Sequence, residues 1–435
     1  MRQVKNDSTI ICGLDVGTTK VCMMITRVNN DGSLELIGSG HAHSAGLKNG
    51  VVVDLEKVAD AIRKAAEEAE READVSVDWV TVSAAGDHFQ SFNSHAVINI
   101  AGPRPEVTYE EMSRVINTAA QSVQITPDRE ILHVLPQEFF LDGRGGTQRP
   151  IGLSGSQFEV NVHVVTCMRV LNQNLINAVN RARMRVKKVV LQPLADAEAV
   201  ITEDEKELGT VLINIGGGTT SIAVFRKNAV QFTRVLPVGG VNFTHDLAIV
   251  LQTPIEDAER IKKESGTVLT ERIQPGETVN VPVMGVRRAV RRNNPPEDSA
   301  GISETETIIA RPVPREKICG ILRARAMELL ELVADQLRKA AGNDFIVERI
   351  IVTGGGSMLE GMTELAEEVF SATARHGLPG GIQGLTENLS LPRHATAIGL
   401  TLFELNEVKN QEKAEDKKPG IIRRILLWIR KKLGI

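Results

Sequence analysis

Three segments of the chain combine apolar runs with short glycine turns. Residues 8–25 and 210–225 each read as an apolar strand, a tight turn and a second apolar strand. Residues 348–370 read as a strand, a glycine turn and a helix. Because the first two segments follow one plan far apart in the chain, they predict an α/β protein with a duplicated domain and a cleft between the halves.

The pattern between these segments predicts helices and one insert. Residues 55–72 have apolar positions at helical spacing, and Thr108 with Glu111 forms a capping-box pair that predicts a helix start. Around this second helix, residues 86–163 form irregular strands rich in Gly, Pro and Asn, which predicts a separate small α+β insert. Residues 285–301 are polar and turn-rich, and we expect a loop there.

The C-terminal part changes character twice. From about residue 404 to 418 charges of both signs dominate, which predicts a flexible linker that Pro419 and Gly420 separate from the end. On a helix drawn at about 100° per residue, the last residues divide into an apolar and a basic arc, with Trp428 at the boundary. Leu427 and Lys432 depart from this division. The apolar arc is Ile421, Ile422, Ile425, Leu426, Ile429 and Leu433, and the basic arc is Arg423, Arg424, Arg430 and Lys431.

This division predicts a helix that lies in the plane of an anionic membrane surface. The stretch is too short and too charged to span a bilayer, which needs about 20 apolar residues. A tryptophan at the boundary is typical of the headgroup level. Two alternatives remain open: the helix docks on the protein's own surface, or it is a target for a calmodulin-like protein.

Composition restricts the possible functions. The chain has 435 residues, of which 42% are apolar and 24% charged, so it can form a large core in about two to four domains. Aromatic residues make up only 3% and the net charge is −4, so we expect no nucleic-acid partner. The four cysteines lie far apart and no signal peptide is evident, which favours the reducing cytosol for the body.

The first glycine turn carries residues suited to phosphate. Gly17 lets the backbone approach a ligand, and Thr18 and Thr19 offer hydroxyl and N–H groups to an anion. Lys20 can neutralise a phosphate, and Asp15 can hold Mg²⁺ through water. The plain alternative is an ordinary β-turn.

The second and third turns strengthen the phosphate prediction. Three consecutive glycines carry an entropic cost that a ligand against the backbone would explain. The third turn is expected to precede a helix, whose N-terminal N–H groups favour an anion. The second turn contains Asn214, Gly216, Gly217, Gly218, Thr219 and Thr220, and the third Gly354, Gly355, Gly356 and Ser357.

In this order and spacing, the three turns resemble the two phosphate motifs and the adenosine motif of the actin, Hsp70 and sugar-kinase superfamily. Residues 191–200 and 394–403 resemble its two connecting motifs. Within the superfamily, the chain is most similar to the FtsA family of bacterial cell-division proteins. This resemblance covers nearly the whole body, the insert, the polar linker and the basic amphipathic end.

The resemblance implies an actin-like, bilobed, duplicated ATPase fold that holds ATP and Mg²⁺ in its cleft. Glu259, Lys262 and Lys263 would lie beside the ribose and adenine, although a solvated helix face is the alternative for them. The implied subdomains are 1A at 7–85, 164–196 and 381–404, 1C at 86–163, 2A at 197–238 and 312–380, and 2B at 239–311, followed by a linker at 405–420 and a membrane helix at 421–435.

One residue departs from the family pattern. The second phosphate motif usually opens with Asp, where this chain has Asn214. An amide can accept a hydrogen bond from metal-bound water but carries no charge. We therefore expect Mg²⁺ to be held through water by Asp15 and Asn214, with weak or no ATP hydrolysis.

The resemblance also implies partners and a location. FtsA-like proteins polymerise on the cytoplasmic face of the inner membrane at the septum and recruit the tubulin-like protein FtsZ. Expected partners are therefore further copies of the chain, the anionic membrane, other division proteins at subdomain 1C, and the FtsZ C-terminal peptide at subdomain 2B and its junction with 2A. Basic residues that could pair with this acidic–apolar peptide are Arg287, Arg288, Arg291, Arg292, Arg311 and Arg315. A solvated loop is the alternative for them.

Two other functions remain open on the sequence alone. A sugar or metabolite kinase would need a catalytic carboxylate to accept a hydroxyl proton, and we find no clear motif for one. A pilus-assembly adaptor of related fold would not be expected to carry the membrane tail.

Overall fold

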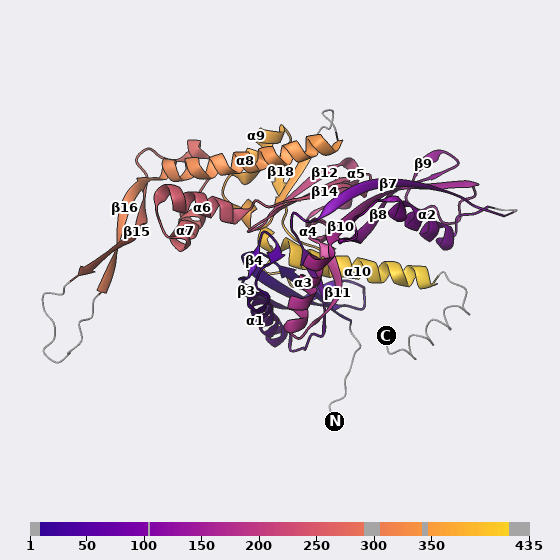
Figure 1. Cartoon of the computed structure of the whole chain (residues 1–435), viewed down its shortest axis with the longest axis horizontal. Helices are drawn as coiled ribbons and strands as arrows, with labels where there is room; N and C mark the ends of the chain where they lie inside the picture. The colour runs from indigo at the N-terminus through magenta and orange to yellow at the C-terminus, as the bar shows by residue number, and fades with distance from the viewer. Residues whose placement is uncertain (1–8, 103–104, 291–304, 342–346, 417–435) are drawn as a thin grey trace, which may run out of the picture.

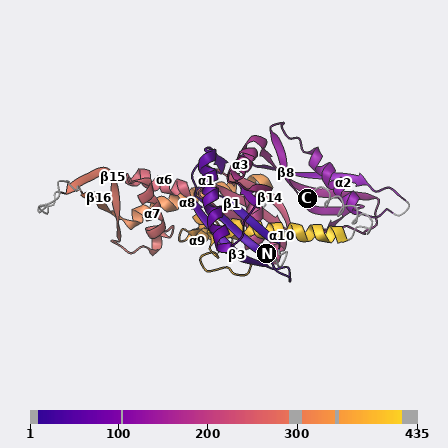
Figure 2. The same cartoon turned by 90° about the horizontal axis from the view of Figure 1, so that it is seen from below.

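The computed structural model describes residues 9–102, 105–290, 305–341 and 347–416. Its parts form an elongated arrangement, with an antiparallel sheet at one end and a two-stranded hairpin at the other (Figure 1). A helix-covered lobe projects from one side between these ends. In the view turned by 90°, the same ends again lie farthest apart (Figure 2).

The first half of the body is built on a five-stranded sheet. Its strands are β1 (Ile10–Val16), β2 (Lys20–Val28), β3 (Leu34–His43), β6 (Trp79–Ala84) and β11 (Arg185–Leu191). The spatial order is β11-β6-β1-β2-β3, in which β1, β2 and β3 form an antiparallel meander. Strands β6 and β11 continue the sheet in parallel with β1.

The second half repeats this plan. Its strands are β12 (Thr210–Ile215), β13 (Thr220–Arg226), β14 (Ala229–Leu236), β17 (Arg349–Thr353) and β18 (Thr373–His376). The order β14-β13-β12-β17-β18 again joins an antiparallel meander to two parallel strands. The predicted duplication is therefore confirmed at the level of strand order and direction.

Two helices lie between the sheets, and others cover their outer faces. Helices α4 (Gln192–Val200) and α10 (Ala395–Asp416) share one core with strands of both sheets. They approach so closely that a Cβ atom on Gly399 would lie 1.9 Å from the carbonyl oxygen of Ala195. The outer helices are α1 (Leu55–Ala73) and α3 (Arg169–Arg181) on the first sheet, and α6 (Gly240–Leu251), α7 (Ile255–Ser265), α8 (Arg315–Ala341) and α9 (Met362–Phe370) with the second.

The insert forms a separate α+β unit, as predicted. Its sheet has the order β7-β10-β8-β9, and α2 packs against it. Helix α2 begins after Thr108, whose hydroxyl accepts from the N–H of Glu111, so the predicted helix start is confirmed. The elements are β7 (Gln90–Asn99), α2 (Tyr109–Ser122), β8 (Arg129–Leu141), β9 (Arg144–Thr147) and β10 (Gln157–Met168).

The insert lies in the sequence between β6 and β11 of the first half, but it packs against β14 of the second half. The hydroxyl of Ser91 donates to the carbonyl of Thr233 at 2.8 Å. The buried ring of His163 lies 2.7 Å from Asn93 Oδ1 and 3.0 Å from Thr233 Oγ1. These polar contacts join the two halves away from the cleft.

The hairpin at the other end corrects one prediction. Strand β15 (Thr278–Val290) pairs with β16 (Thr305–Pro314), so residues 285–290 are strand rather than loop. The cause is the partner strand, which pairs again beyond a register shift between Pro282 and Arg287, with Arg287 opposite Ile308 and Arg288 opposite Thr307. The rest of the expected loop lies outside the described residues.

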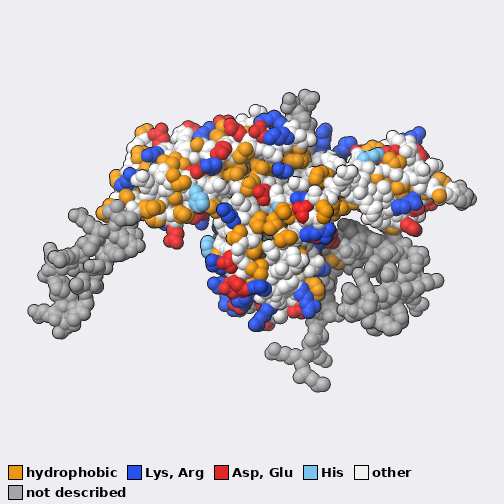
Figure 3. Space-filling view, in the orientation of Figure 1, with side chains coloured by type: hydrophobic (Ala, Val, Ile, Leu, Met, Phe, Trp, Pro, Cys, Tyr) orange, Lys and Arg blue, Asp and Glu red, His pale blue; other side chains and the backbone are white. Residues whose placement is uncertain are grey.

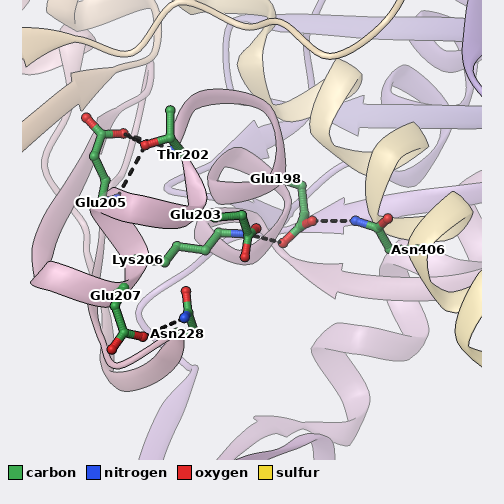
Figure 4. A network of polar contacts seen from close by, with 8 residues as sticks. All are labelled: Glu198, Thr202, Glu203, Glu205, Lys206, Glu207, Asn228 and Asn406. Atoms are coloured by element: carbon green, nitrogen blue, oxygen red, sulfur yellow. Dashed lines mark hydrogen bonds and ion pairs between the residues drawn. The ribbon is translucent and has the colours of Figure 1, made fainter. Parts of the chain in front are cut away.

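Helix α10 corrects a second prediction, because it continues to Asp416 through most of the expected linker. Leu405 is buried, and the buried carboxylate of Glu404 accepts from Thr81 and Lys187. Asn406 donates to Glu198 at 2.6 Å, within a polar network that also holds α5 (Glu203–Leu208) (Figure 4). Anchoring by these side chains explains why the charged stretch begins as helix. Residues 417–420 and the expected membrane helix lie outside the described residues.

The remaining described elements are short: β4 (Leu47–Lys48), β5 (Val51–Val52), and the 3₁₀ turns η1 (Thr270–Arg272), η2 (Gly355–Met358) and η3 (Pro392–His394).

Candidate functional site

A cleft of about 1370 Å³ lies between the two halves, and all three glycine turns contribute to its walls. Helices α6 and α7 and the η3 turn before α10 complete the lining. The predicted residues that line it are Asp15, Gly17, Thr18, Thr19, Lys20, Asn214, Gly216, Gly217, Thr219, Glu259, Lys262, Lys263, Gly354, Gly355 and Gly356.

The first two turns have the same closing hydrogen bond. Gly17 N donates to Lys20 O at 3.0 Å, and Gly216 N donates to Thr219 O at 2.8 Å. The turns also face one another, because a Cβ atom on Gly218 would lie 2.6 Å from Thr18 Oγ1. Two hairpins from repeated halves therefore meet tip to tip at the floor of the cleft.

These tips present backbone donors. No described residue provides an acceptor for the backbone N–H groups of Thr18, Thr19 and Gly217, which line the cleft. Successive N–H groups without acceptors form a concave site that suits an anion. The arrangement can therefore hold an oxyanion such as a phosphate.

Lys20 supplies a positive charge beside the first turn. Its ammonium group donates to the carbonyl of Arg393 at 3.0 Å and lies 3.2 Å from Nδ1 of His394. Both partners belong to η3 at the start of α10. Lys20 thus connects the first turn to the segment that leads into α10.

The third turn follows the expected order of strand, glycine turn and helix, with a short 3₁₀ segment before the α-helix. After β17, Gly354 has φ +85°, a conformation that favours glycine, and its missing side chain makes room for Asn214 Oδ1. The turn then enters the short 3₁₀ segment η2, and α9 begins only at Met362. The predicted helix after the turn is therefore confirmed, but its N-terminus lies at Met362 and does not reach the three glycines.

An acidic centre lies behind the turns. The Asp15 carboxylate is buried and accepts from Ser83 Oγ at 2.7 Å. Burial raises the pKa of Asp15, while the Ser83 hydrogen bond and the charge of Lys20 oppose this rise. The nearby Asn214 donates from Nδ2 to Asp196 Oδ2 at 2.7 Å. Its Oδ1 is buried and has no hydrogen-bond partner among the described residues.

Asp196 is a carboxylate that the sequence analysis did not single out. It is fully buried and accepts from Asn214 and from Thr396 Oγ1, each at 2.7 Å. Burial raises the pKa of Asp196 to about 7 despite these two donors, and the charge of Asp15 adds to the rise. Gln192 joins the same network, because its Nε2 lies 3.3 Å from Thr396 Oγ1. Both Asp196 and Gln192 lie in the first connecting motif, which was the available signal.

A second polar cluster lies on α6 and α7. Lys262 donates to the carbonyl of Gly240 at 3.0 Å, to Thr244 Oγ1 at 2.9 Å and to Glu259 Oε2 at 2.6 Å. Burial of the Glu259 carboxyl opposes its ionisation, but Lys262 and hydrogen bonds from Thr244 and Lys263 outweigh this and lower the pKa of Glu259 to about 2. The pair is therefore held in place rather than freely solvated.

Three of the predicted phosphate-site residues do not line the cleft. Gly218 packs against Thr18, and Thr220 donates its hydroxyl to the carbonyl of Val238 at 2.8 Å. Ser357 is buried and donates to the carbonyl of Gly354 at 2.7 Å. These contacts support the turns rather than face the cavity.

The predicted peptide-binding arginines separate into three groups. Arg287 and Arg288 lie on β15, and Arg291 and Arg292 lie outside the described residues. Arg311 donates to the carbonyl of Leu251 at 3.0 Å. Arg315 pairs with Glu277 at 2.8 Å, donates to Ser265 and lines the cleft.

Charges of both signs are interspersed over the face seen in Figure 3. Among the described residues, no helix is long and apolar enough to cross a membrane.

The repeated meander sheets, the central helix pair and the cleft with opposed glycine turns define an actin-like protein. Comparisons with solved structures agree on this fold. The chain superimposes on a structure described as a PilM–PilN type IV pilus biogenesis complex with a TM-score of 0.63 at 16% identity, covering 91% of this chain and 98% of that one. A structure of MreB5 of Spiroplasma citri bound to ADP gives a TM-score of 0.52 at 15% identity, covering 94% and 99%.

The chain belongs to the FtsA family of cell-division proteins. Residues 211–399 match the family model described as "Cell division protein FtsA", and residues 86–166 match the "SHS2 domain inserted in FTSA". The cell division protein FtsA of Pseudomonas aeruginosa is 36% identical, with 97% of each chain covered. The FtsA of Escherichia coli K12 is 33% identical, with 98% of each chain covered. The resemblance drawn from the sequence is thereby confirmed, and it assigns the chain a role in cell division.

Proposed function

We propose that the chain binds ATP in its cleft, polymerises on the cytoplasmic face of the bacterial inner membrane at the septum, and tethers FtsZ there. The observation that carries the ATP part is the opposition of the two glycine–threonine turns beside Lys20. Their N–H groups without acceptors match the oxygens of a phosphate chain. The likeness of the fold to MreB5 described as bound to ADP supports the same ligand class.

The orientation of the nucleotide follows from the chemistry of the walls. Its phosphates would lie against the first two turns, where N–H donors and Lys20 meet. Its ribose and base would extend toward Glu259, Lys262 and the third turn, where a carboxylate can accept from hydroxyls. The second carboxylate oxygen of Glu259, Oε1, lies 3.0 Å from Nζ of Lys263. The carboxylate is therefore already held in position on this wall of the cleft.

The acidic centre fits Mg²⁺ held through water. The Asp15 carboxylate lines the cleft, and Asn214 Oδ1 is a buried acceptor without a partner among the described residues. Mg²⁺ keeps several waters and uses few carboxylates, and when bound it would neutralise charge on the phosphates. Asn214 carries no charge, and the raised pKa of Asp196 favours its neutral form. The centre therefore polarises water weakly, and we propose slow or absent ATP hydrolysis.

Membrane attachment is proposed from the basic amphipathic end. Each cation near an anionic surface contributes about 1 kcal/mol, and each buried aliphatic or aromatic side chain adds roughly 1.5–3 kcal/mol. Ordering the segment offsets much of this, so one tail would bind reversibly. Several tails on one polymer gain avidity, since each further contact is intramolecular. Polymerisation and membrane attachment would therefore reinforce one another.

The FtsZ peptide is proposed to dock on subdomain 2B. Two apolar residues lie where the end of α6 meets β15, Ile249 with 74% and Met284 with 56% of their surface exposed. Arg311 and Arg315 already have partners within the chain, and Arg287, Arg288, Arg291 and Arg292 are the further candidates to pair with its acidic residues. The division into subdomains and the contact of other division proteins with subdomain 1C remain parts of this proposal.

Electron microscopy of the full chain with ATP on an anionic lipid monolayer tests the whole proposal. We expect short actin-like filaments with ATP, few without nucleotide, and none for a chain that ends at Lys418. Filaments that form equally without ATP would contradict the role of the cleft. A pilus-assembly adaptor of the same fold would give no filaments on this monolayer, and a metabolic kinase would transfer phosphate to a sugar in a panel assay.

A further inference from the structure

A sulfur–imidazole cluster lies beside the first turn, and the proposed nucleotide chemistry does not use it. Cys22 on β2 and His41 on β3 are direct cross-strand partners. His394 reaches them from η3, with Nδ1 3.3 Å from His41 Nε2 and 3.7 Å from Cys22 Sγ. The three atoms all lie within 4.8 Å of one another. Three separate elements thus bring two imidazoles and a thiol to one point.

The spacing of these atoms matches a metal site. In a tetrahedral zinc site the bonds are about 2.0–2.3 Å, so neighbouring ligand atoms lie roughly 3.3–3.7 Å apart. The two distances from His394 Nδ1 already have these lengths. A small closing movement between Cys22 and His41 would complete the triangle.

The chemistry of the three groups selects the class of metal. Both imidazoles present a ring nitrogen to the cluster, His41 through Nε2 and His394 through Nδ1, and a neutral imidazole nitrogen is a common metal ligand. The Cys22 side chain is fully buried, which excludes bulk water from its sulfur. Imidazole with thiolate suits Zn²⁺ or another thiophilic ion, whereas Mg²⁺ prefers oxygen ligands.

We propose that Cys22, His41 and His394 form a binding site for a thiophilic metal ion, with Zn²⁺ as the representative case. His41 and His394 line the cleft while Cys22 lies behind them, so the fourth coordination position faces the cleft. A site with one such open position accepts water or a ligand. This site uses other side chains than the Asp15 and Asn214 centre, although Asp15 on β1 is the cross-strand partner of Cys22, and it does not depend on nucleotide binding.

Two cations compete with the metal at His394. Lys20 Nζ lies 3.2 Å from Nδ1, the atom that would ligate, and Arg393 Nε lies 3.1 Å from Nε2. When Nδ1 ligates, Nε2 carries the proton, so Arg393 must turn away and Lys20 must leave Nδ1. The site is therefore weaker than a closed structural zinc site. A bound metal would also free the Lys20 ammonium group from His394, so that it can turn toward the first glycine turn. Only this last consequence rests on the proposed nucleotide site.

Cobalt titration of the full chain tests the site. The chelator-stripped, reduced protein is titrated with Co²⁺, which reports tetrahedral coordination in the visible spectrum and thiolate ligation in the near ultraviolet. We expect one equivalent to give both signals and Zn²⁺ to displace it. Cys22→Ser should abolish the thiolate band, and both Cys22→Ser and His41→Gln should weaken binding at least about tenfold.

Matched variants make the test specific. Cys12→Ser removes another buried thiol of the same sheet, and His43→Gln removes the next histidine along β3, so both should bind like the wild type. Lys20→Met should tighten Co²⁺ binding severalfold, because it removes the competing ammonium. A spectrum without the thiolate band in the wild type, or unchanged affinity in folded His41→Gln, would overturn the proposal.

Discussion

Thr19 and Gly217 belong to hairpins of different halves, yet a Cβ atom on Gly217 would lie 2.6 Å from both Oγ1 and Cγ2 of Thr19. The glycine is therefore required for the contact between the hairpins themselves, in addition to any ligand. A valine at this position would separate the turns before a nucleotide arrives. Gly355 is different, because its nearest neighbour to an added Cβ is Arg393 Cβ at 3.9 Å.

This difference separates a fold effect from a ligand effect. Gly355→Val should leave the free energy of unfolding within about 0.5 kcal/mol of the wild type, as is typical of exposed positions. It should still weaken ATP binding at least about tenfold, or about 1.4 kcal/mol, because the new side chain stands in the cleft. Gly217→Val should lose both stability and binding. Nucleotide titration and thermal unfolding provide the measurements, and normal affinity in Gly355→Val would remove the third turn from the site.

The Asn214–Asp196 pair predicts a mutational swap. In the structure Asn214 Nδ2 lies 2.7 Å from Asp196 Oδ2. Asn214→Asp alone replaces this amide donor by a second carboxyl and should destabilise the fold by about 1–3 kcal/mol. Adding Asp196→Asn restores one amide–carboxyl pair and should recover most of that loss. The double variant places the charge at the family's usual position, so phosphate release should be faster than in the wild type. A fast wild-type rate would show that Asn214 does not limit hydrolysis.

The buried ring of His163 predicts acid sensitivity of the contact between the insert and β14. Burial lowers the pKa of His163 to about 4 from 6.5, so the folded state favours the neutral ring. The unfolded chain binds the proton more readily, so this contribution is complete above pH 6.5 and is lost as the pH falls toward 4. The loss amounts to about 3 kcal/mol at most.

Unfolding in urea between pH 7 and pH 4 tests this, with His163→Gln expected to flatten the pH dependence. His95→Gln, an exposed histidine on β7 of the same sheet, is the control and should retain the slope. An identical slope in the wild type and His163→Gln would assign the acid sensitivity to other groups.

The C-terminal end predicts a selective loss of vesicle binding. Trp428→Glu should abolish cosedimentation while ATP binding survives, because it places a charge at the lipid boundary. Arg423 and Arg424 changed together to Glu should lose most on strongly anionic vesicles, and salt should weaken the wild type in the same way. Trp79→Glu is the matched control, since Trp79 is half exposed on β6. If a chain ending at Lys418 sediments normally, the tail is not the anchor.

The arginines of subdomain 2B predict a graded response to an acidic–apolar peptide. Arg287 and Arg288 changed together to Glu, and likewise Arg291 and Arg292, should weaken binding measured by fluorescence anisotropy. Arg315→Glu should instead lower stability, because it breaks the contacts with Glu277 and Ser265. If neither pair weakens binding, the peptide docks elsewhere.

The sequence predicted the parts of this fold that depend on local pattern. Apolar strands around glycine turns are recognisable because burial on both faces requires continuous apolar runs, and β1 and β12 show such burial. The linker was misjudged because its helical state depends on distant partners, such as Thr81 and Lys187 for Glu404. Composition alone contains no information on such contacts.

The sequence indicated the glycine turns, which the backbone itself forms, and the side chains that belong to the same motifs, such as Asp15, Lys20 and Asn214. Glycine and threonine at a turn are a local signal, whereas Asp196 becomes important through packing that raises its pKa. The cluster of Cys22, His41 and His394 also arises from tertiary structure, because its members lie on three elements. Side chains that act through long-range neighbours were therefore the ones missed.

Helix α10 starts at the turn that Lys20 contacts and ends at Asp416. Its 22 residues at 1.5 Å per residue make it about 33 Å long, and its first half is clamped against α4. The free second half is about 16 Å long, so a tilt of about 5° at the clamp would move the far end by roughly 1.4 Å. Because one rigid helix runs from the cleft to Asp416, a movement at the cleft changes the position and direction of the far end of α10.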